Sequence, residues 1–121
     1  EIRFWQLYLD GSFGSGASEK FVLAGDANLD PSHSDGRREA IRNLLADPRL
    51  RDVQPVGAHG TDSVDWTDVD AGILRVDYVL PSSDWIVEGS GVLWPDEGDP
   101  FLETVKQASR HRVVWVDLRL P

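Results

Sequence analysis

The fold class is indicated by the stretch Lys-Phe-Val-Leu-Ala-Gly at residues 20–25, which is short and apolar and ends in glycine. Such a run is typical of a buried β-strand whose carboxyl end opens into a loop. The residues that follow, 26–36, are densely polar. Because side chains at the end of a strand converge beyond the edge of a rigid sheet, we expect a functional site at this loop.

Helices are predicted on both sides of this strand from apolar residues at helical spacing. They span residues 2–9, residues 37–46 and a short segment that starts at Asp99 and Pro100. Asp35 is the predicted N-cap of the second helix, and Asp47 followed by Pro48 ends that helix.

Three further strands are predicted, over residues 73–80, 85–94 and 112–120. The first alternates apolar and polar residues, which places Asp77 on the face opposite its apolar neighbours. The second should bend at its two glycines, and residues 51–72 form a long irregular connection that only residues 63–66 interrupt. Together these segments predict an α/β (α+β) domain with a mixed β-sheet and flanking helices.

Length and composition limit the possible functions. With 121 residues, the chain is one domain or part of one, and a second full domain is excluded. A formal charge of -9 disfavours a nucleic-acid-binding module, although a local basic patch is compatible with it. The absence of cysteine excludes disulfides, thiolate zinc sites, iron–sulfur clusters and cysteine nucleophiles. No apolar run approaches the roughly 18 residues that cross a bilayer, so no membrane span is expected.

The polar loop does not fit the common metal and nucleotide motifs. Asp26, Asn28 and Asp30 alternate as in an EF-hand. However, Pro31 stands where the tight turn needs glycine, and Arg37 stands where the bidentate glutamate belongs. The sequence also lacks an HExxH zinc motif, a P-loop, a dinucleotide-binding GxGxxG and a GxSxG nucleophile elbow. Those enzyme classes are therefore disfavoured.

Four side chains remain as candidates for chemistry. Asp26 and Asn28 follow the first strand, Asp77 lies within another, and His111 stands at the start of the last. An Asp on a strand can orient an imidazole and stabilise its protonated form, which suits a site that handles phosphate. The alternative is structural, because an Asp and an Asn after a strand commonly form an Asx turn, and a single His beside a strand is commonly structural.

Three stretches resemble, in order, motifs of the endonuclease/exonuclease/phosphatase superfamily: residues 21–28, 75–82 and 109–118. That group includes pancreatic-type deoxyribonucleases, abasic-site endonucleases, sphingomyelinases and inositol-phosphate phosphatases, and this sequence looks most like a bacterial branch of it. The resemblance implies a phosphoesterase that depends on a divalent cation, usually magnesium (Mg²⁺) or else manganese (Mn²⁺). In such an enzyme water attacks a phosphate ester in line, and the cation neutralises developing charge.

The same resemblance implies roles for the four candidates. Asp26 positions or activates the attacking water and is a possible ligand of an incomplete metal site, Asn28 contacts the phosphoryl oxygens, and Asp77 holds the catalytic His111. The family usually has Ser-Asp-His where this chain has Ser-Arg-His at residues 109–111, so Arg110 replaces a carboxylate and would bind substrate phosphate. This departure leaves open a second class of function, a non-enzymatic binding domain that keeps the fold with a degenerate site.

Members of the superfamily are built from two similar halves whose sheets pack face to face under outer helices, and the three motifs belong to the second half. The resemblance therefore implies that residues 1–121 are a single partial domain, the C-terminal half of a four-layer α/β/β/α sandwich. We expect the missing N-terminal half to supply the main metal-binding Glu, so the fragment alone should be nearly inactive. The exposed sheet face should favour homo-oligomers. The substrate, whether nucleic acid, lipid or small phosphate ester, and the compartment stay open.

Overall fold

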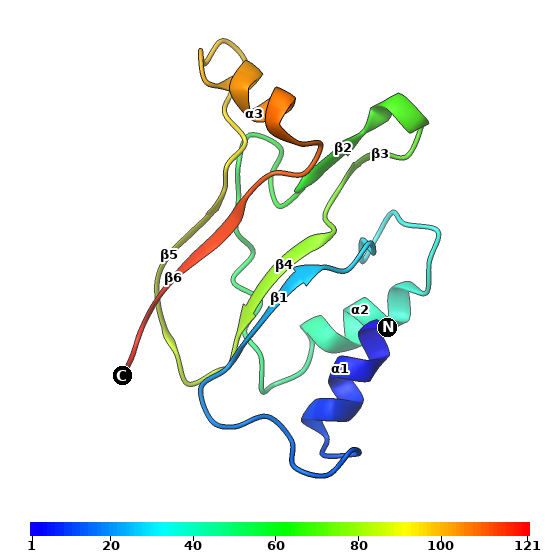
Figure 1. Ribbon diagram of the computed structural model, residues 1–121, viewed down its shortest axis with the longest axis vertical. Coiled ribbons are helices and arrows are strands. Elements are labelled where there is room, and N and C mark those ends of the chain that lie inside the picture. Colours follow the sequence, from blue (N-terminus) through cyan, green and yellow to red (C-terminus); the bar gives the residue numbers. More distant parts are fainter.

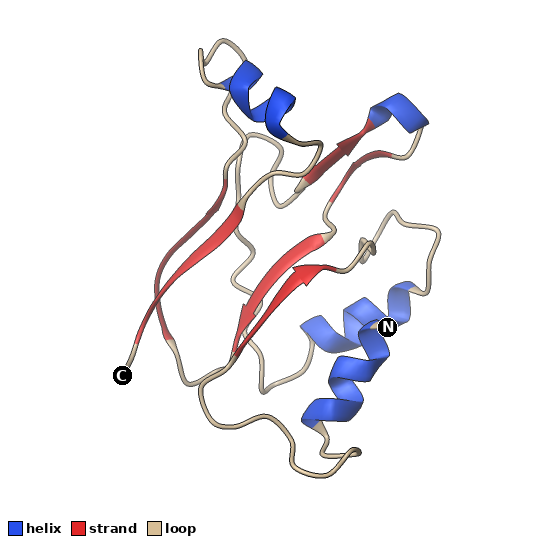
Figure 2. Cartoon of the chain, in the orientation of Figure 1, coloured by secondary structure: helices blue, strands red, loops and turns tan.

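Helices and antiparallel strand pairs make up the computed structural model, which describes all residues from 1 to 121 (Figures 1 and 2). In chain order the elements are α1 (Ile2–Leu9), β1 (Val22–Asp26), α2 (Arg38–Leu45), β2 (Val64–Trp66), the 3₁₀ turn η1 (Thr67–Val69), β3 (Gly72–Leu74), β4 (Asp77–Pro81), β5 (Ile86–Val92), α3 (Leu102–Ala108) and β6 (Val114–Arg119). The α+β class is confirmed, but the strands form the antiparallel pairs β1–β4, β2–β3 and β5–β6 rather than one mixed sheet. None of the helices is long and apolar enough to cross a membrane.

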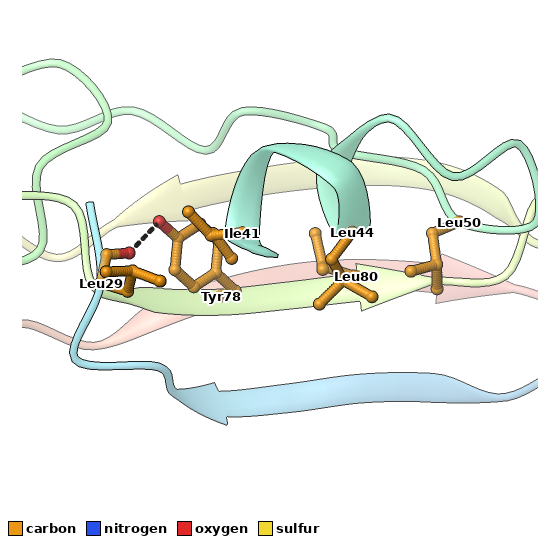
Figure 3. Packing of buried hydrophobic residues seen from close by; sticks show 6 residues of the cluster. All are labelled: Leu29, Ile41, Leu44, Leu50, Tyr78 and Leu80. Atoms are coloured by element: carbon orange, nitrogen blue, oxygen red, sulfur yellow. Dashed lines mark hydrogen bonds between the residues drawn. The ribbon is translucent and has the colours of Figure 1, made fainter. Parts of the chain in front are cut away.

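The main hydrophobic core lies between helix α2 and the β1–β4 sheet (Figure 3). Ile41 and Leu44 of α2 pack against Tyr78 and Leu80 of β4, as the close-up shows. Helix α1 lies beside α2, and its partly buried residues adjoin the same core. The two helices therefore cover one face of the sheet, which is the face that Tyr78 and Leu80 share.

The predicted strand over residues 73–80 is divided in the structure into β3 and β4. Arg75 donates its backbone N–H to the Asp30 carboxylate (2.9 Å), and Val76 donates its backbone N–H to the Ser63 hydroxyl (3.1 Å). These two N–H groups bond side chains instead of a neighbouring strand, so the ladder is interrupted there. Alternation along the chain could not indicate the break, because both acceptors come from distant segments.

Two predicted details are wrong. The strand β1 is not buried, since four of its five residues are exposed and the helices cover only one face of its sheet. The predicted N-cap of α2 is not formed either. The helix begins at Arg38, so Asp35 lies too far upstream to accept a hydrogen bond from the first-turn N–H groups.

The strand β5 bends where its glycines predict a bend. Its register with β6 shifts between Val87 and Gly89, which is a β-bulge. Trp115 of β6 lies across Gly91, where an added Cβ would come within 2.8 Å of the indole ring. The close packing of that ring on the backbone therefore requires glycine at this position.

Candidate active site

Two carboxylates face each other at the end of the β1–β4 ladder. Asp26 is the last residue of β1, Asp77 is the first of β4, and their Cα atoms are partners in the antiparallel register. Side chains alternate between the two faces of a strand, so both carboxylates lie on the face opposite Tyr78 and the helices. Like charges directly opposite each other repel, so this pair favours a cation nearby.

His111 joins this pair from a distant part of the chain. It precedes β6 on a short extended segment that forms an antiparallel bridge to Val64 of β2. Its Nδ1 lies 2.9 Å from Oδ2 and 3.1 Å from Oδ1 of Asp77. The Trp66 ring packs edge-on against the imidazole, with 5.6 Å between the ring centroids. The expected contact between Asp77 and His111 is therefore confirmed.

The cluster offers oxygen ligands for a divalent cation. Asp26, Asp77 and His111 each place one potential ligand atom within 4.8 Å of the others. The Nδ1 atom of His111 is engaged by Asp77, whereas Asp26 is exposed and its carboxylate is accessible. Magnesium in proteins commonly takes one or two carboxylates and completes its shell with water and substrate phosphate. The donor chemistry of Asp26 fits such an ion.

Asn28 lies at the same end of β1 as Asp26. Its backbone N–H donates to Asp26 Oδ1 (2.7 Å), and the residue has a left-handed φ of 49°, which Asn tolerates better than most residues. The Asx turn that was the structural alternative is therefore present. Asn28 also lines a cavity of about 710 Å³ between α1 and the start of α2, and Asp77 and His111 do not line that cavity.

Arg110 lies apart from the carboxylates and the imidazole. Its guanidinium is 3.1 Å from Asp68, and both side chains are more than half exposed. Neighbouring residues of an extended segment point to opposite sides, which separates Arg110 from His111. Arg110 instead lines a cavity of about 250 Å³ together with five other polar residues: Asp65, Thr67, Asp68, Lys106 and Arg112.

The charge of that cavity is mixed. Three cationic side chains line it together with the acidic Asp65 and Asp68. Hydrogen bonds from Thr67 lower the pKa of Asp65. Arg112 is the buried member, and its guanidinium lies over the Trp94 ring at 4.5 Å. A ligand that binds here has to compete with the carboxylates that already neutralise part of the positive charge.

Ser63 belongs to the site but was not predicted from the sequence. This residue is fully buried, and its Oγ lies 2.7 Å from Asp77 Oδ2. A lone Ser in a polar connection carries no signal of burial. The short apolar interruption at residues 63–66 was the one available hint, and it marks the start of β2.

The sequence matches the family model described as "Endonuclease/Exonuclease/phosphatase family" over residues 1–111. The chain belongs to the endonuclease/exonuclease/phosphatase family. A solved structure, an endonuclease/exonuclease/phosphatase family protein from Leptotrichia buccalis C-1013-b, superposes with a TM-score of 0.58 at 22% sequence identity. The match covers 95% of this chain and 40% of that one, and it supports the fold. No curated protein matches the sequence.

Family membership confirms the resemblance inferred from the three ordered motifs. Members of the endonuclease/exonuclease/phosphatase family hydrolyse phosphate esters and generally depend on a divalent cation. The present chain spans 40% of the length of the related structure.

Proposed function

We propose that this chain supplies catalytic groups to a divalent-metal-dependent phosphoesterase of the endonuclease/exonuclease/phosphatase family. The observation that carries the proposal is the hydrogen bond between Asp77 and His111, 2.9 Å long, with the Asp26 carboxylate directly across the ladder from Asp77. Phosphate ester hydrolysis can use a carboxylate and an imidazole held by a second carboxylate. These side chains lie on a face that the helices do not cover.

In the proposed reaction, water attacks the phosphorus in line and the bond between phosphorus and the leaving oxygen breaks. Asp26 orients the water and accepts its proton, and Asn28 contacts a phosphoryl oxygen. His111, held by Asp77, faces the phosphoryl group and stabilises the charge that develops on it. The bound cation, Mg²⁺ or Mn²⁺, would be held through the Asp26 carboxylate and would neutralise negative charge on the phosphoryl oxygens.

Arg110 keeps a proposed role in substrate binding, at a distance from the reacting phosphate. Its cavity contains none of Asp26, Asp77 or His111. We therefore assign to it a remote anionic part of the substrate, for which the guanidinium would have to leave Asp68.

We further propose that residues 1–121 are the C-terminal half of the catalytic domain and that an N-terminal half completes the metal site. Two observations support this: the chain covers 40% of the related structure, and β1 leaves Val22 and Asp26 exposed on the uncovered face of its sheet. The isolated chain would then hydrolyse phosphate esters slowly or not at all.

The decisive experiment compares two histidines in the full-length protein. Hydrolysis of bis(p-nitrophenyl) phosphate and p-nitrophenyl phosphate is measured with Mg²⁺. His111→Ala should lower the rate by about two orders of magnitude or more, as expected for loss of a positioned acid–base or electrostatic group. His59→Ala is the matched control, because His59 is exposed and contacts Trp94 outside the cluster. Equal and negligible rates in all three proteins would favour a non-enzymatic binding domain.

A further inference from the structure

Ser63 is a buried polar residue at the meeting point of three segments. Its side chain is 0% exposed. Its backbone N–H donates to the Leu74 carbonyl oxygen (2.8 Å), and its own carbonyl oxygen accepts the N–H of Arg112 (2.7 Å). Ser63 is thereby fixed between β3 and the segment that carries His111.

The hydrogen bonds of the Ser63 hydroxyl can be assigned completely. The oxygen accepts the backbone N–H of Val76 (3.1 Å) and that of Asp77 (3.0 Å), and it lies 2.7 Å from Asp77 Oδ2. A serine hydroxyl has two acceptor positions and one proton. Because both acceptor positions are used, the proton must point to the Asp77 carboxylate.

This assignment also determines the imidazole tautomer. An ionised carboxylate only accepts hydrogen bonds, so the contact of 2.9 Å between Asp77 Oδ2 and His111 Nδ1 requires a proton on Nδ1. The other ring nitrogen, Nε2, is then the one that exchanges protons or contacts a phosphoryl oxygen. The imidazole is about one-third exposed, at 34%, so the ring is accessible from solvent.

We propose that Ser63 is the positioning residue of the Asp77–His111 pair. Its hydroxyl holds the Asp77 carboxylate as a pure acceptor in one orientation, and the carboxylate in turn holds His111 in the Nδ1–H tautomer. The use of Nε2 in catalysis rests on the proposed function, whereas the tautomer itself does not depend on it.

A purely structural role for Ser63 is the competing explanation. The hydroxyl satisfies two backbone N–H groups at the break between β3 and β4, so its loss would destabilise the fold in either case. Only the positioning role predicts a change at the His111 ring in a protein that remains folded. The experiment must therefore measure which ring nitrogen of His111 carries the proton.

The experiment records the ¹⁵N resonances of the histidine rings by two-dimensional NMR in the 121-residue chain, at about pH 8.5, where a free imidazole is neutral. We expect Nδ1–H for His111 in the wild type and a transfer of the proton towards Nε2 in Ser63→Ala. Ser109→Ala is the matched control, because the exposed Ser109 hydroxyl accepts the His111 backbone N–H (3.0 Å) without touching Asp77. This control should keep the wild-type ring signals.

Two results would overturn the proposal: an Nε2–H tautomer in the wild type, or an unchanged His111 ring in a folded Ser63→Ala protein. If Ser63→Ala does not fold, Ser63→Cys gives the same test, since a thiol of similar size is a weak donor. That variant should show a smaller transfer of the proton, and unchanged ring signals would reject the proposal.

In the full-length enzyme Ser63→Ala should lower kcat by about 10- to 100-fold at nearly constant KM, the range for loss of an outer partner of a functional His. If His111 carries the Nδ1 proton but the full-length wild-type protein hydrolyses no phosphate ester, the proposed function is refuted. The positioning role of Ser63 is not affected by that result.

Discussion

Asp26 and Asp77 are register partners at the last position of the β1–β4 ladder, and they place two carboxylates on the same face of the sheet. A divalent cation bound there would relieve their repulsion and would stabilise the folded state, because it binds that state and not the unfolded chain. We predict that Mg²⁺ or Mn²⁺ at millimolar concentration raises the thermal unfolding midpoint of the chain, and only to a small extent if the proposed N-terminal half completes the metal site.

The effect should disappear in Asp26→Asn, which keeps the size of the side chain and removes its charge. Differential scanning calorimetry with and without the cation measures it. Asp117→Asn is the control, because Asp117 is an exposed carboxylate on β6 and should leave the shift in place. An equal shift in wild type and Asp26→Asn would mean that the cation binds elsewhere.

The ion pair between Arg110 and Asp68 gives a prediction on substrate affinity. If Arg110 holds a remote anionic group, Arg110→Ala raises KM and leaves kcat nearly unchanged, since uniform binding is lost. Asp68→Asn should have the opposite effect on KM, because it releases the guanidinium from its partner at 3.1 Å. Steady-state kinetics of the full-length protein measure both, and no change in KM for either variant would remove Arg110 from the substrate site.

Much of the arrangement of the candidate site could be predicted from the sequence. The alternation around Asp77 and the apolar strand after His111 reflect periodic burial, which local sequence records directly. The apolar run before Asp26 indicated the strand β1 but not its exposure. The contact between Asp77 and His111 is implied by the resemblance to the family and agrees with the predicted position of both residues on strands with apolar opposite faces. The catalytic roles of these residues stay predictions.

What could not be predicted depends on contacts between distant segments. The break between β3 and β4 arises because Asp30 and Ser63 side chains take the backbone N–H groups there. The ion pair of Arg110 with Asp68 joins residues 42 positions apart. Neither a buried acceptor nor a long-range ion pair produces a periodic pattern, so composition and spacing carry no trace of them.

The exposed part of β1 predicts self-association. Val22 is 42% exposed on the face that the helices do not cover, and uncovered apolar sheet surface favours contact with another apolar surface. We expect oligomers of the 121-residue chain by light scattering after gel filtration, together with binding of a hydrophobic dye. Val22→Lys should reduce both signals.

Val56→Lys is the matched control for this face, because Val56 is an exposed valine at 60% in the connection between α2 and β2. It should leave association unchanged. A strict monomer at high concentration that binds no dye would contradict the proposal that an N-terminal half covers this face.

The pairing of Asp47 with Arg49 predicts how stability depends on pH. Hydrogen bonds from Arg49 Nη2 (2.5 Å) and Nε (2.9 Å) lower the pKa of the Asp47 carboxyl below its ordinary value of 3.8. As pH falls, the unfolded chain therefore takes up a proton before the folded chain does, so this stabilisation is present above about pH 4 and is lost below it. The urea unfolding midpoint should accordingly decrease between about pH 6 and pH 3.

In Arg49→Met the decrease should be smaller, because the pKa of Asp47 is then no longer held down. Arg119→Met, which breaks the exposed pair with Glu88, should show the wild-type pH dependence. Identical pH dependence in wild type and Arg49→Met would show that the Asp47 pair does not contribute to acid stability.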